Sequence, residues 1–170
     1  MPLLQLVKYP ASILTSKASP IVVFDQVLRQ LADDMFETMY ASEGVGLAAP
    51  QIGLSLQLFV MDCGGLKIVA ANPEILLTNG IQDGEEGCLS LDRIYSHLPR
   101  PNGARLWAQD LNGKTFELEV QGLPARCVLH ETDHCNGKLF ISHLSPLQRD
   151  IVIRKFRKKQ KERHRPKQRF

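Results

Sequence analysis

The segment 25–44 places apolar side chains at intervals of three or four residues. These positions are Leu28, Leu31, Met35 and Met39. The period is that of one face of an α-helix, which this segment is expected to form. Asp25 is a favourable N-cap residue, and Gly44 is expected to end the helix because glycine often occupies the position that follows one.

Two further helices are expected nearer the C-terminus. The first should begin near Pro124, a favoured first-turn residue, and stop by Gly137. The second should open at Ser145-Pro146 and turn four apolar side chains inward, namely Leu147, Ile151, Val152 and Phe156. No large apolar residue follows until Phe170, so packing cannot hold this end, which is expected to be a projecting helix end or a mobile tail.

Two stretches have the pattern of β-hairpins. LQLFVMDCGGLKIVAANP (56–73) is two strand-like runs around Gly64-Gly65, and ARLWAQDLNGKTFELEV (104–120) repeats this around Asn112-Gly113. Hairpins with few helices favour an α+β fold over a parallel α/β fold. We expect antiparallel sheets packed around the helix that begins near Pro124, followed by a C-terminal helix.

Composition bounds the class of protein. A chain of 170 residues is long enough for one domain with its own core, and 44% hydrophobic with 23% charged residues is ordinary for a globular protein. No window approaches the run of about 18 apolar residues that a membrane span needs. The opening segment MPLLQLVKYPASIL resembles neither a signal peptide nor a transit peptide, so we expect a cytoplasmic protein with no membrane partner.

Charge divides the chain in two. Residues 149–170 hold 11 Lys/Arg and 2 Asp/Glu, whereas residues 1–148 hold 10 and 16. An acidic body, 1–148, therefore carries a basic C-terminal helix or tail, 149–170. A polyanion, if one binds, is expected to bind the tail.

The segment VLHETDHCNGKLF (128–140) contains the pattern HExxH. On a helix, this spacing puts His130 and His134 one turn apart on the same face. Two imidazoles can then bind one metal ion, and Glu131 beside them can carry a proton. The pattern also occurs in ordinary core helices, and two ligands do not complete a catalytic site.

Several candidates for a third ligand are poorly placed. The longer pattern HExxHxxGxxH needs a histidine where this chain has Phe140, and Glu162 lies in the basic tail, a poor place for a dry metal site. Cys135 points about 100° away from His134 around the helix. Cys127 lies about 10 Å along the axis from His134, too far for bonds to one ion.

Two cysteines remain. Cys63 is expected in an exposed hairpin turn. Cys88 follows Gly87 in DGEEGCLSL, where the backbone can bend to present a thiolate to a separate helix. We therefore expect a site of Cys88, His130 and His134 with a water as fourth ligand. Three protein ligands with one open position is the arrangement of catalytic sites.

Three motifs occur in order along the chain: GVGLAAPQIG (44–53), EGCLS (86–90) and HETDH (130–134). In this order and at these distances they are similar to the signature motifs of the peptide deformylase family. The likeness continues through LVKYPASIL near the start and NGKLFISHLSPL after the expected metal helix, so it covers roughly residues 1–150.

The resemblance implies an activity for the domain 1–148. Members of the family remove the N-formyl group from the N-terminal formyl-methionine of newly synthesised proteins. A metallopeptidase that cuts internal bonds shares HExxH but does not account for the other two motifs. A second alternative is an inactive relative that binds the ribosome, although every expected catalytic position is filled.

The resemblance also implies roles for the catalytic residues. Glu131 would act as general base toward water and then as acid toward the leaving amine. The side-chain amide of Gln51 and the backbone N–H of Leu89 would stabilise the developing oxyanion. The family is known for ferrous iron, with zinc, nickel or cobalt as substitutes; the Cys/His/His ligand set alone does not decide between Fe(II) and Zn.

Substrate contacts follow from the same resemblance. Gly44, Val45 and Gly46 would lie along the peptide, which pairs with this stretch in strand fashion. Leu123 and Cys127, together with Val45, map to the pocket for the methionine side chain.

The chain departs from the family's pattern after EGCLS. Asp92 stands where a proline is usual, and Tyr95 stands where many members have an arginine, which leaves the peptide preference open. Asp133 is expected to orient a ligand or to pair with an arginine such as Arg100, with a simple surface salt bridge as the alternative.

The basic tail has two interpretations. It is either a solvated, solubilising end or a segment that docks on ribosomal RNA, where formyl-methionyl chains emerge. We favour the second and expect no DNA partner.

Overall fold

The computed structural model describes residues 3–166. Its main sheet has five antiparallel strands in the order β1-β2-β3-β6-β7. These are β1 (Gly46–Ala48), β2 (Leu58–Cys63), β3 (Leu66–Asn79), β6 (Gly103–Gln109) and β7 (Thr115–Gln121). A short second sheet pairs β4 (Glu85–Glu86) with β5 (Ser96–His97). The helices are α1 (Gln26–Ala41), α2 (Leu123–Cys135) and α3 (Pro146–Arg163).

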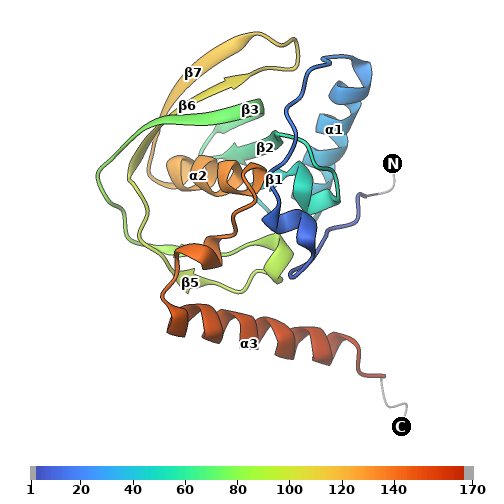
Figure 1. Ribbon diagram of the computed structural model, residues 1–170, viewed down its shortest axis with the longest axis vertical. Helices are drawn as coiled ribbons and strands as arrows, with labels where there is room; N and C mark the ends of the chain where they lie inside the picture. Colours follow the sequence, from blue (N-terminus) through green and yellow to red (C-terminus); the bar gives the residue numbers. More distant parts are fainter. Residues whose placement is uncertain (1–2, 167–170) are drawn as a thin grey trace.

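The expected α+β architecture is confirmed, with α2 at the centre of the molecule and α3 at one end (Figure 1). None of the helices described is long and apolar enough to cross a membrane. Both expected hairpins are present, β2–β3 and β6–β7. Gly64 and Gly65 have φ of 60° and 81°, left-handed values that the tight turn between β2 and β3 requires.

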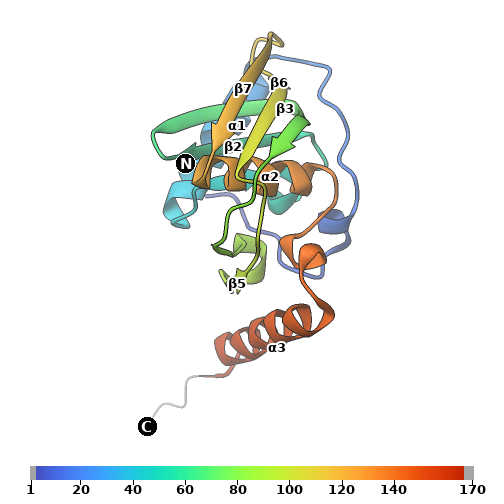
Figure 2. The ribbon, with the colours of Figure 1, turned by 90° about the vertical axis from the view of Figure 1, so that its left-hand side faces the viewer.

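The main sheet is covered on both faces near β2 because its side chains alternate. Phe59 and Met61 pack in one cluster with Val128 of α2, whereas Leu58 and Val60 pack in another with helix α1. Figure 2 shows α2 lying against the sheet formed by β3, β6 and β7. Because α2 is enclosed between this sheet and the loops that carry β4 and β5, most of its polar side chains are buried.

Helix α1 begins as expected and ends earlier. The Asp25 carboxylate accepts a hydrogen bond from Leu28 N, which confirms the cap. The last helical residue is Ala41, and the left-handed position after the helix is taken by Glu43, with φ of 56°. Gly44 instead leaves room for the Leu89 side chain, since a Cβ at position 44 would lie 3.0 Å from Leu89 Cδ1.

Cys63 corrects a second expectation. It is the last residue of β2 rather than part of an exposed turn, and it is buried against α2. The turn itself comprises only Gly64 and Gly65, so the strand pattern extends to the residue before them.

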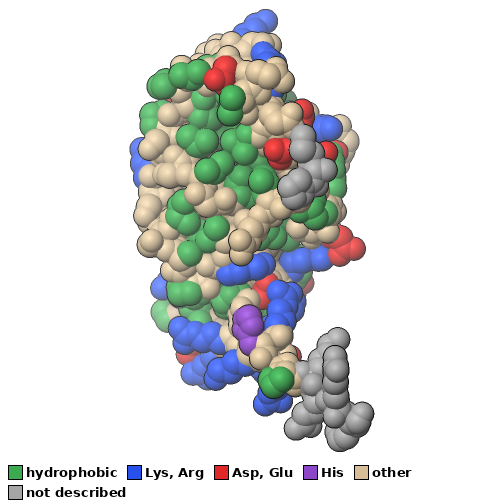
Figure 3. Space-filling model, turned by 90° about the vertical axis from the view of Figure 1, so that its right-hand side faces the viewer, with side chains coloured by type: hydrophobic (Ala, Val, Ile, Leu, Met, Phe, Trp, Pro, Cys, Tyr) green, Lys and Arg blue, Asp and Glu red, His purple; other side chains and the backbone are tan. Residues whose placement is uncertain are grey.

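Helix α3 buries fewer of its apolar side chains than expected. Val152 and Phe156 are buried, but Leu147 and Ile151 are exposed. The helix continues to Arg163 and is held there by polar contacts rather than packing. Lys and Arg side chains gather at this end of the molecule (Figure 3). Residues 167–170 of the basic tail lie outside the described part of the chain.

Candidate metal centre

Helix α2 presents the two histidines of HExxH on its buried face. His130 and His134 are 9% and 1% exposed, and their Nε2 atoms lie 3.1 Å apart. The helix starts at Leu123 with Pro124 in its first turn and ends at Cys135, within two residues of the expected bounds. The i, i+4 spacing therefore brings both rings to one point, as the pattern predicts.

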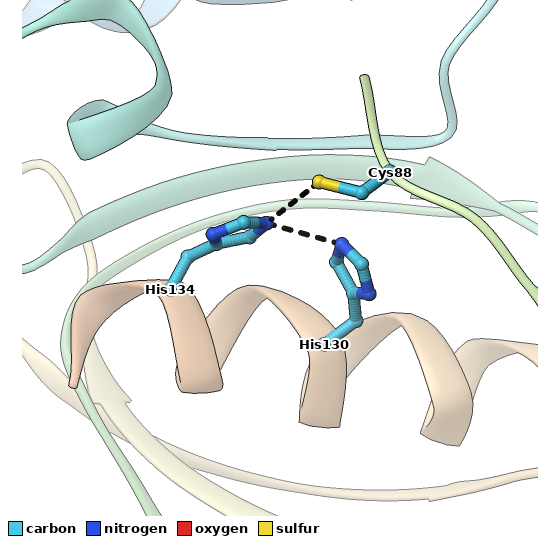
Figure 4. A group of neighbouring side chains, drawn as sticks. All are labelled: Cys88, His130 and His134. Carbon is cyan, nitrogen blue, oxygen red and sulfur yellow. Dashed lines mark hydrogen bonds between the residues drawn. The ribbon is translucent and has the colours of Figure 1, made fainter. Parts of the chain in front are cut away.

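Cys88 reaches the same point from a different part of the chain. It lies in extended backbone just before the 3₁₀ turn η3 (Leu89–Leu91), and its Sγ is 3.3 Å from His134 Nε2 (Figure 4). The ligand atoms of Cys88, His130 and His134 all lie within 4.8 Å of one another. Metal bonds of about 2.0–2.3 Å in a tetrahedral site separate neighbouring ligand atoms by roughly 3.3–3.8 Å. The distances from His134 Nε2, 3.3 Å to Cys88 Sγ and 3.1 Å to His130 Nε2, are close to this range, so small shifts of the side chains suffice for all three donors to bind one ion.

Gly87, next to Cys88, is needed for a reason other than the expected bend. Its φ is not in the left-handed region, but a Cβ there would lie 2.8 Å from the ring of Tyr95. The glycine thus leaves room for the Tyr95 ring beside the backbone that precedes Cys88.

Glu131 is buried beside the histidines, and its Oε2 has no partner among the described residues. Burial raises the pKa of Glu131 to about 7; the neighbouring His130 opposes this shift and the charge of Glu86 adds to it. Its space depends on Gly46, because a Cβ there would lie 2.5 Å from Glu131 Oε1. A carboxyl group with this pKa can both accept and return a proton near neutral pH.

Two hydrogen-bond donors lie close to Cys88. Gln51 is buried; its Oε1 accepts from Ala48 N at 3.0 Å, which directs its Nε2 toward Cys88 Sγ at 3.5 Å and Ser90 Oγ at 3.3 Å. Within residues 3–166, the backbone N–H of Leu89 makes no hydrogen bond to the protein. Both donors are therefore close to the place where the three ligand atoms meet.

A charged network behind the ligands was not anticipated from the sequence. His130 Nδ1 lies 2.8 Å from Glu86 Oε2, and Glu86 also accepts hydrogen bonds from Arg100 and Arg126. Burial alone would raise the pKa of Glu86, but the hydrogen bonds and charges of His130 and Arg100 outweigh it and hold the pKa well below its ordinary value. The signal for Glu86 was its position two residues before Cys88, in EGCLS.

The expected partner of Asp133 is present. Arg100 Nη1 is 3.0 Å from Asp133 Oδ2, and His143 Nε2 is 2.8 Å from the same oxygen. Arg100 thus links Asp133 to Glu86, and through Glu86 to His130. Asp133 is thus connected to His130 through Arg100 and Glu86, and its side chain is 20% exposed, so the contact is not a simple surface salt bridge.

A cavity of about 220 Å³ opens onto this centre. The expected catalytic residues Gln51, Leu89 and Glu131 line it, as do the expected substrate contacts, which are Gly44, Val45, Gly46, Leu123 and Cys127. Of the expected ligands, Cys88 and His130 line the cavity and His134 lies behind them. A larger hollow of about 960 Å³ lies elsewhere, beside Trp107 and Asp133, and contains none of these residues.

Comparison with known proteins points to one family. The sequence model of the family described as polypeptide deformylase matches residues 3–150. The peptide deformylase of Acidobacterium capsulatum is 46% identical over 161 residues, which cover 92% of this chain and 95% of that protein. The crystal structure of a peptide deformylase from Legionella pneumophila superposes with a TM-score of 0.91 at 44% identity, covering 97% of this chain and all of that one. A structure from Synechococcus elongatus in complex with actinonin gives 0.86 at 36% identity, covering 91% and 88%.

Proposed function

The chain belongs to the polypeptide deformylase family, and we propose that Cys88, His130 and His134 hold the metal ion on which its activity depends. It is a metal-dependent hydrolase that removes the formyl group from the N-terminal formyl-methionine of newly synthesised proteins. The observation that carries the proposed ligand set is the convergence of one sulfur and two ring nitrogens within 4.8 Å, in a buried site that opens onto a cavity.

A divalent ion bound by these ligands supplies Lewis acidity, which lowers the pKa of water enough for attack on a stable amide near neutral pH. The ion proposed is Fe(II), with zinc, nickel or cobalt as substitutes. The thiolate of Cys88 and the imidazoles of His130 and His134 suit all four metals. Glu86 orients the ring of His130 by accepting from Nδ1, which leaves Nε2 free to bind metal.

Glu131 removes a proton from the attacking water and returns it to the nitrogen of the departing peptide. Its raised pKa, about 7, suits both steps because neither protonation state is strongly disfavoured at neutral pH. The Gln51 amide and the Leu89 N–H donate to the carbonyl oxygen of the formyl group as negative charge develops on it. A single donor of this kind typically contributes about 2.7–4 kcal/mol to stabilisation of the transition state.

The peptide is proposed to bind along β1. This strand lies at the edge of the main sheet and pairs only with β2 among the described strands, so its other side can accept a further strand. Val45 and Leu123 are exposed on the rim of the cavity, and Cys127 lies deeper. These side chains form an apolar surface suited to a methionine side chain.

The basic helix α3 is proposed to dock on ribosomal RNA in the cytoplasm. The exposed cations Lys155, Arg157, Lys158 and Lys161 carry the charge outward, where phosphates can be bound with release of counterions.

A formate-release assay tests the proposed function. Protein purified without oxygen should release formate from formyl-Met-Ala-Ser, leave the acetylated twin intact, and be inhibited by actinonin. Cys88→Ala should lose both the bound metal and this turnover. Cleavage of internal peptide bonds, or undiminished activity of Cys88→Ala, would contradict the proposal.

A further inference from the structure

The loop that carries Cys88 and Leu89 ends in a residue with unusual surroundings. Asp92 has φ of 51° in the left-handed region, and its side chain is completely buried. A proline, which the resemblance leads one to expect here, cannot adopt this φ. Aspartate tolerates it better than most residues do.

Four side chains converge on Asp92 from two distant parts of the chain. Its carboxylate pairs with Lys8 Nζ at 2.9 Å and with Arg163 Nη1 at 3.1 Å, and it accepts a hydrogen bond from Gln160. Its backbone oxygen accepts from Lys159 Nζ at 2.8 Å. We call Asp92 and these four partners, Lys8, Lys159, Gln160 and Arg163, the Asp92 cluster.

The Asp92 cluster also contacts Leu89, at the start of the loop formed by residues 88–92. Lys8 Nζ donates to Leu89 O at 2.7 Å while it pairs with Asp92, so one ammonium group bridges both ends of η3. Tyr9 N, next to Lys8 in the chain, donates to Ser90 O at 2.9 Å. The Leu89 N–H itself belongs to the preceding peptide unit, whose carbonyl oxygen, Cys88 O, accepts from Leu91 N and Arg93 N at 3.0 Å. By fixing Leu89 O and Asp92, the cluster holds the turn that makes these two hydrogen bonds and thereby restrains the peptide unit that carries the Leu89 N–H.

Helix α3 contributes through its last two turns. Val152 and Phe156 pack on the body, and beyond them the same face presents Lys159, Gln160 and Arg163 to Asp92. Residues 157–163 include no apolar side chain, so polar and charged contacts hold this part of the helix. An exposed ion pair contributes little, and Arg163 is 54% exposed, but the carboxylate of Asp92 is fully buried, so removing its partners would leave a buried charge less compensated.

We propose that Asp92 is a positioning residue, through which Lys8 and the C-terminal turns of α3 hold residues 88–92 so that the Leu89 N–H faces the substrate carbonyl. The proposal rests on the function proposed for Leu89. It gives the C-terminal helix a part in catalysis that is separate from any docking on a polyanion.

Paired variants test this without touching the cavity. Lys159→Ala/Arg163→Ala removes two charges that contact Asp92. Lys114→Ala/Lys138→Ala removes two charges at exposed positions outside α3, whose side chains make no hydrogen bond or ion pair among the described residues. We expect kcat for formyl-Met-Ala-Ser to fall about tenfold in the first variant, with KM changed less than about twofold, because a loosened donor costs less than a deleted one. The second variant should match the unmodified enzyme.

Amide hydrogen exchange provides a readout that needs no substrate. Leu91 N and Arg93 N both donate to Cys88 O at 3.0 Å, so their exchange reports on the loop directly. Exchange at both should speed up at least about tenfold in Lys159→Ala/Arg163→Ala and in Asp92→Asn, which keeps the left-handed conformation accessible, and not in the control pair.

Equal exchange and equal kcat in the two paired variants would overturn the proposal. Faster exchange in the loop without loss of kcat would also overturn it, because the loop would then be held for reasons unrelated to the donor. If the unmodified enzyme released no formate, the proposed function would fail, and the exchange result would still decide whether the Asp92 cluster holds the loop.

Discussion

Replacing Glu86 by glutamine should weaken both the fold and the metal site, because this one carboxylate neutralises two buried arginines and orients His130. The side chains of Glu86, Arg100 and Arg126 are 4%, 7% and 6% exposed, so solvent screens their interactions poorly. Removing one partner of a buried ion pair costs about 3–5 kcal/mol. Arg100 keeps Asp133 and Arg126 keeps the carbonyl of Leu98, so the lower end, about 3 kcal/mol, is expected.

The free energy of metal binding should fall less in Glu86→Gln than the free energy of unfolding does. The glutamine oxygen can still accept from His130 Nδ1, but it lacks the charge that raises the basicity of the ring. Loss of a partner of this kind typically reduces metal affinity about 10–100-fold, and the conservative substitution should lie near tenfold, or about 1.4 kcal/mol. The stability of the metal-free protein is measured by urea unfolding, and affinity is measured by competition with a coloured chelator.

Glu119→Gln serves as the matched control for this variant. Glu119 pairs with Arg105 at 2.6 Å, but the two side chains are 72% and 42% exposed, so its replacement should change stability by less than about 1 kcal/mol and leave metal affinity unaltered. The reasoning is refuted if Glu86→Gln unfolds at the same urea concentration as Glu119→Gln and binds metal equally well.

Three further outcomes are expected. Glu131→Gln should retain its metal while kcat falls by about 10²–10⁴-fold, measured by formate release; unchanged turnover would remove Glu131 from its proposed role. Gly46→Ala should lower kcat about 10²-fold, because its Cβ would lie 2.5 Å from Glu131 Oε1 and 2.9 Å from Cys127 Sγ and would displace the Glu131 carboxyl group. Full activity of this variant would show that catalysis does not require the present position of that group. Burial alone would raise the pKa of Asp92, but the hydrogen bonds and charges of Lys8 and the other donors outweigh burial and lower it. The ionised Asp92 carboxylate should therefore stabilise the fold fully above about pH 4, and this stabilisation should be lost as the pH falls further. The difference in unfolding free energy between Asp92→Asn and the unmodified protein should accordingly be constant from about pH 8 to 5 and shrink in acid, and a difference independent of pH throughout would contradict this.

Much of the fold was predictable because local signals agree with it. The cap at Asp25, the paired glycines 64–65 and the proline at the start of α2 each fix an element within a few residues. The inward face of α3 was less predictable. The spacing of apolar residues does not show how much of the helix surface the rest of the domain covers. In addition, the residues that face inward near the end of α3 are polar, namely Lys159, Gln160 and Arg163.

The candidate site was predictable where chemistry requires a particular residue type. Two histidines at helical spacing and one cysteine beside a glycine can be found in the sequence. Glu86, Arg126 and Asp92 were harder to find because burial of a charged residue depends on its partners, and those partners lie 14 to 84 residues away. Long-range pairing of this kind leaves no periodic signal in one sequence.

The central claim is that one sulfur and two ring nitrogens bind a single ion. X-ray absorption at the metal edge, on active protein purified without oxygen, tests it most directly. We predict one ion per chain with one sulfur at about 2.3 Å, two nitrogens near 2.0–2.1 Å, and loss of the sulfur signal in Cys88→Ala. An active enzyme whose metal has no sulfur neighbour would contradict this account.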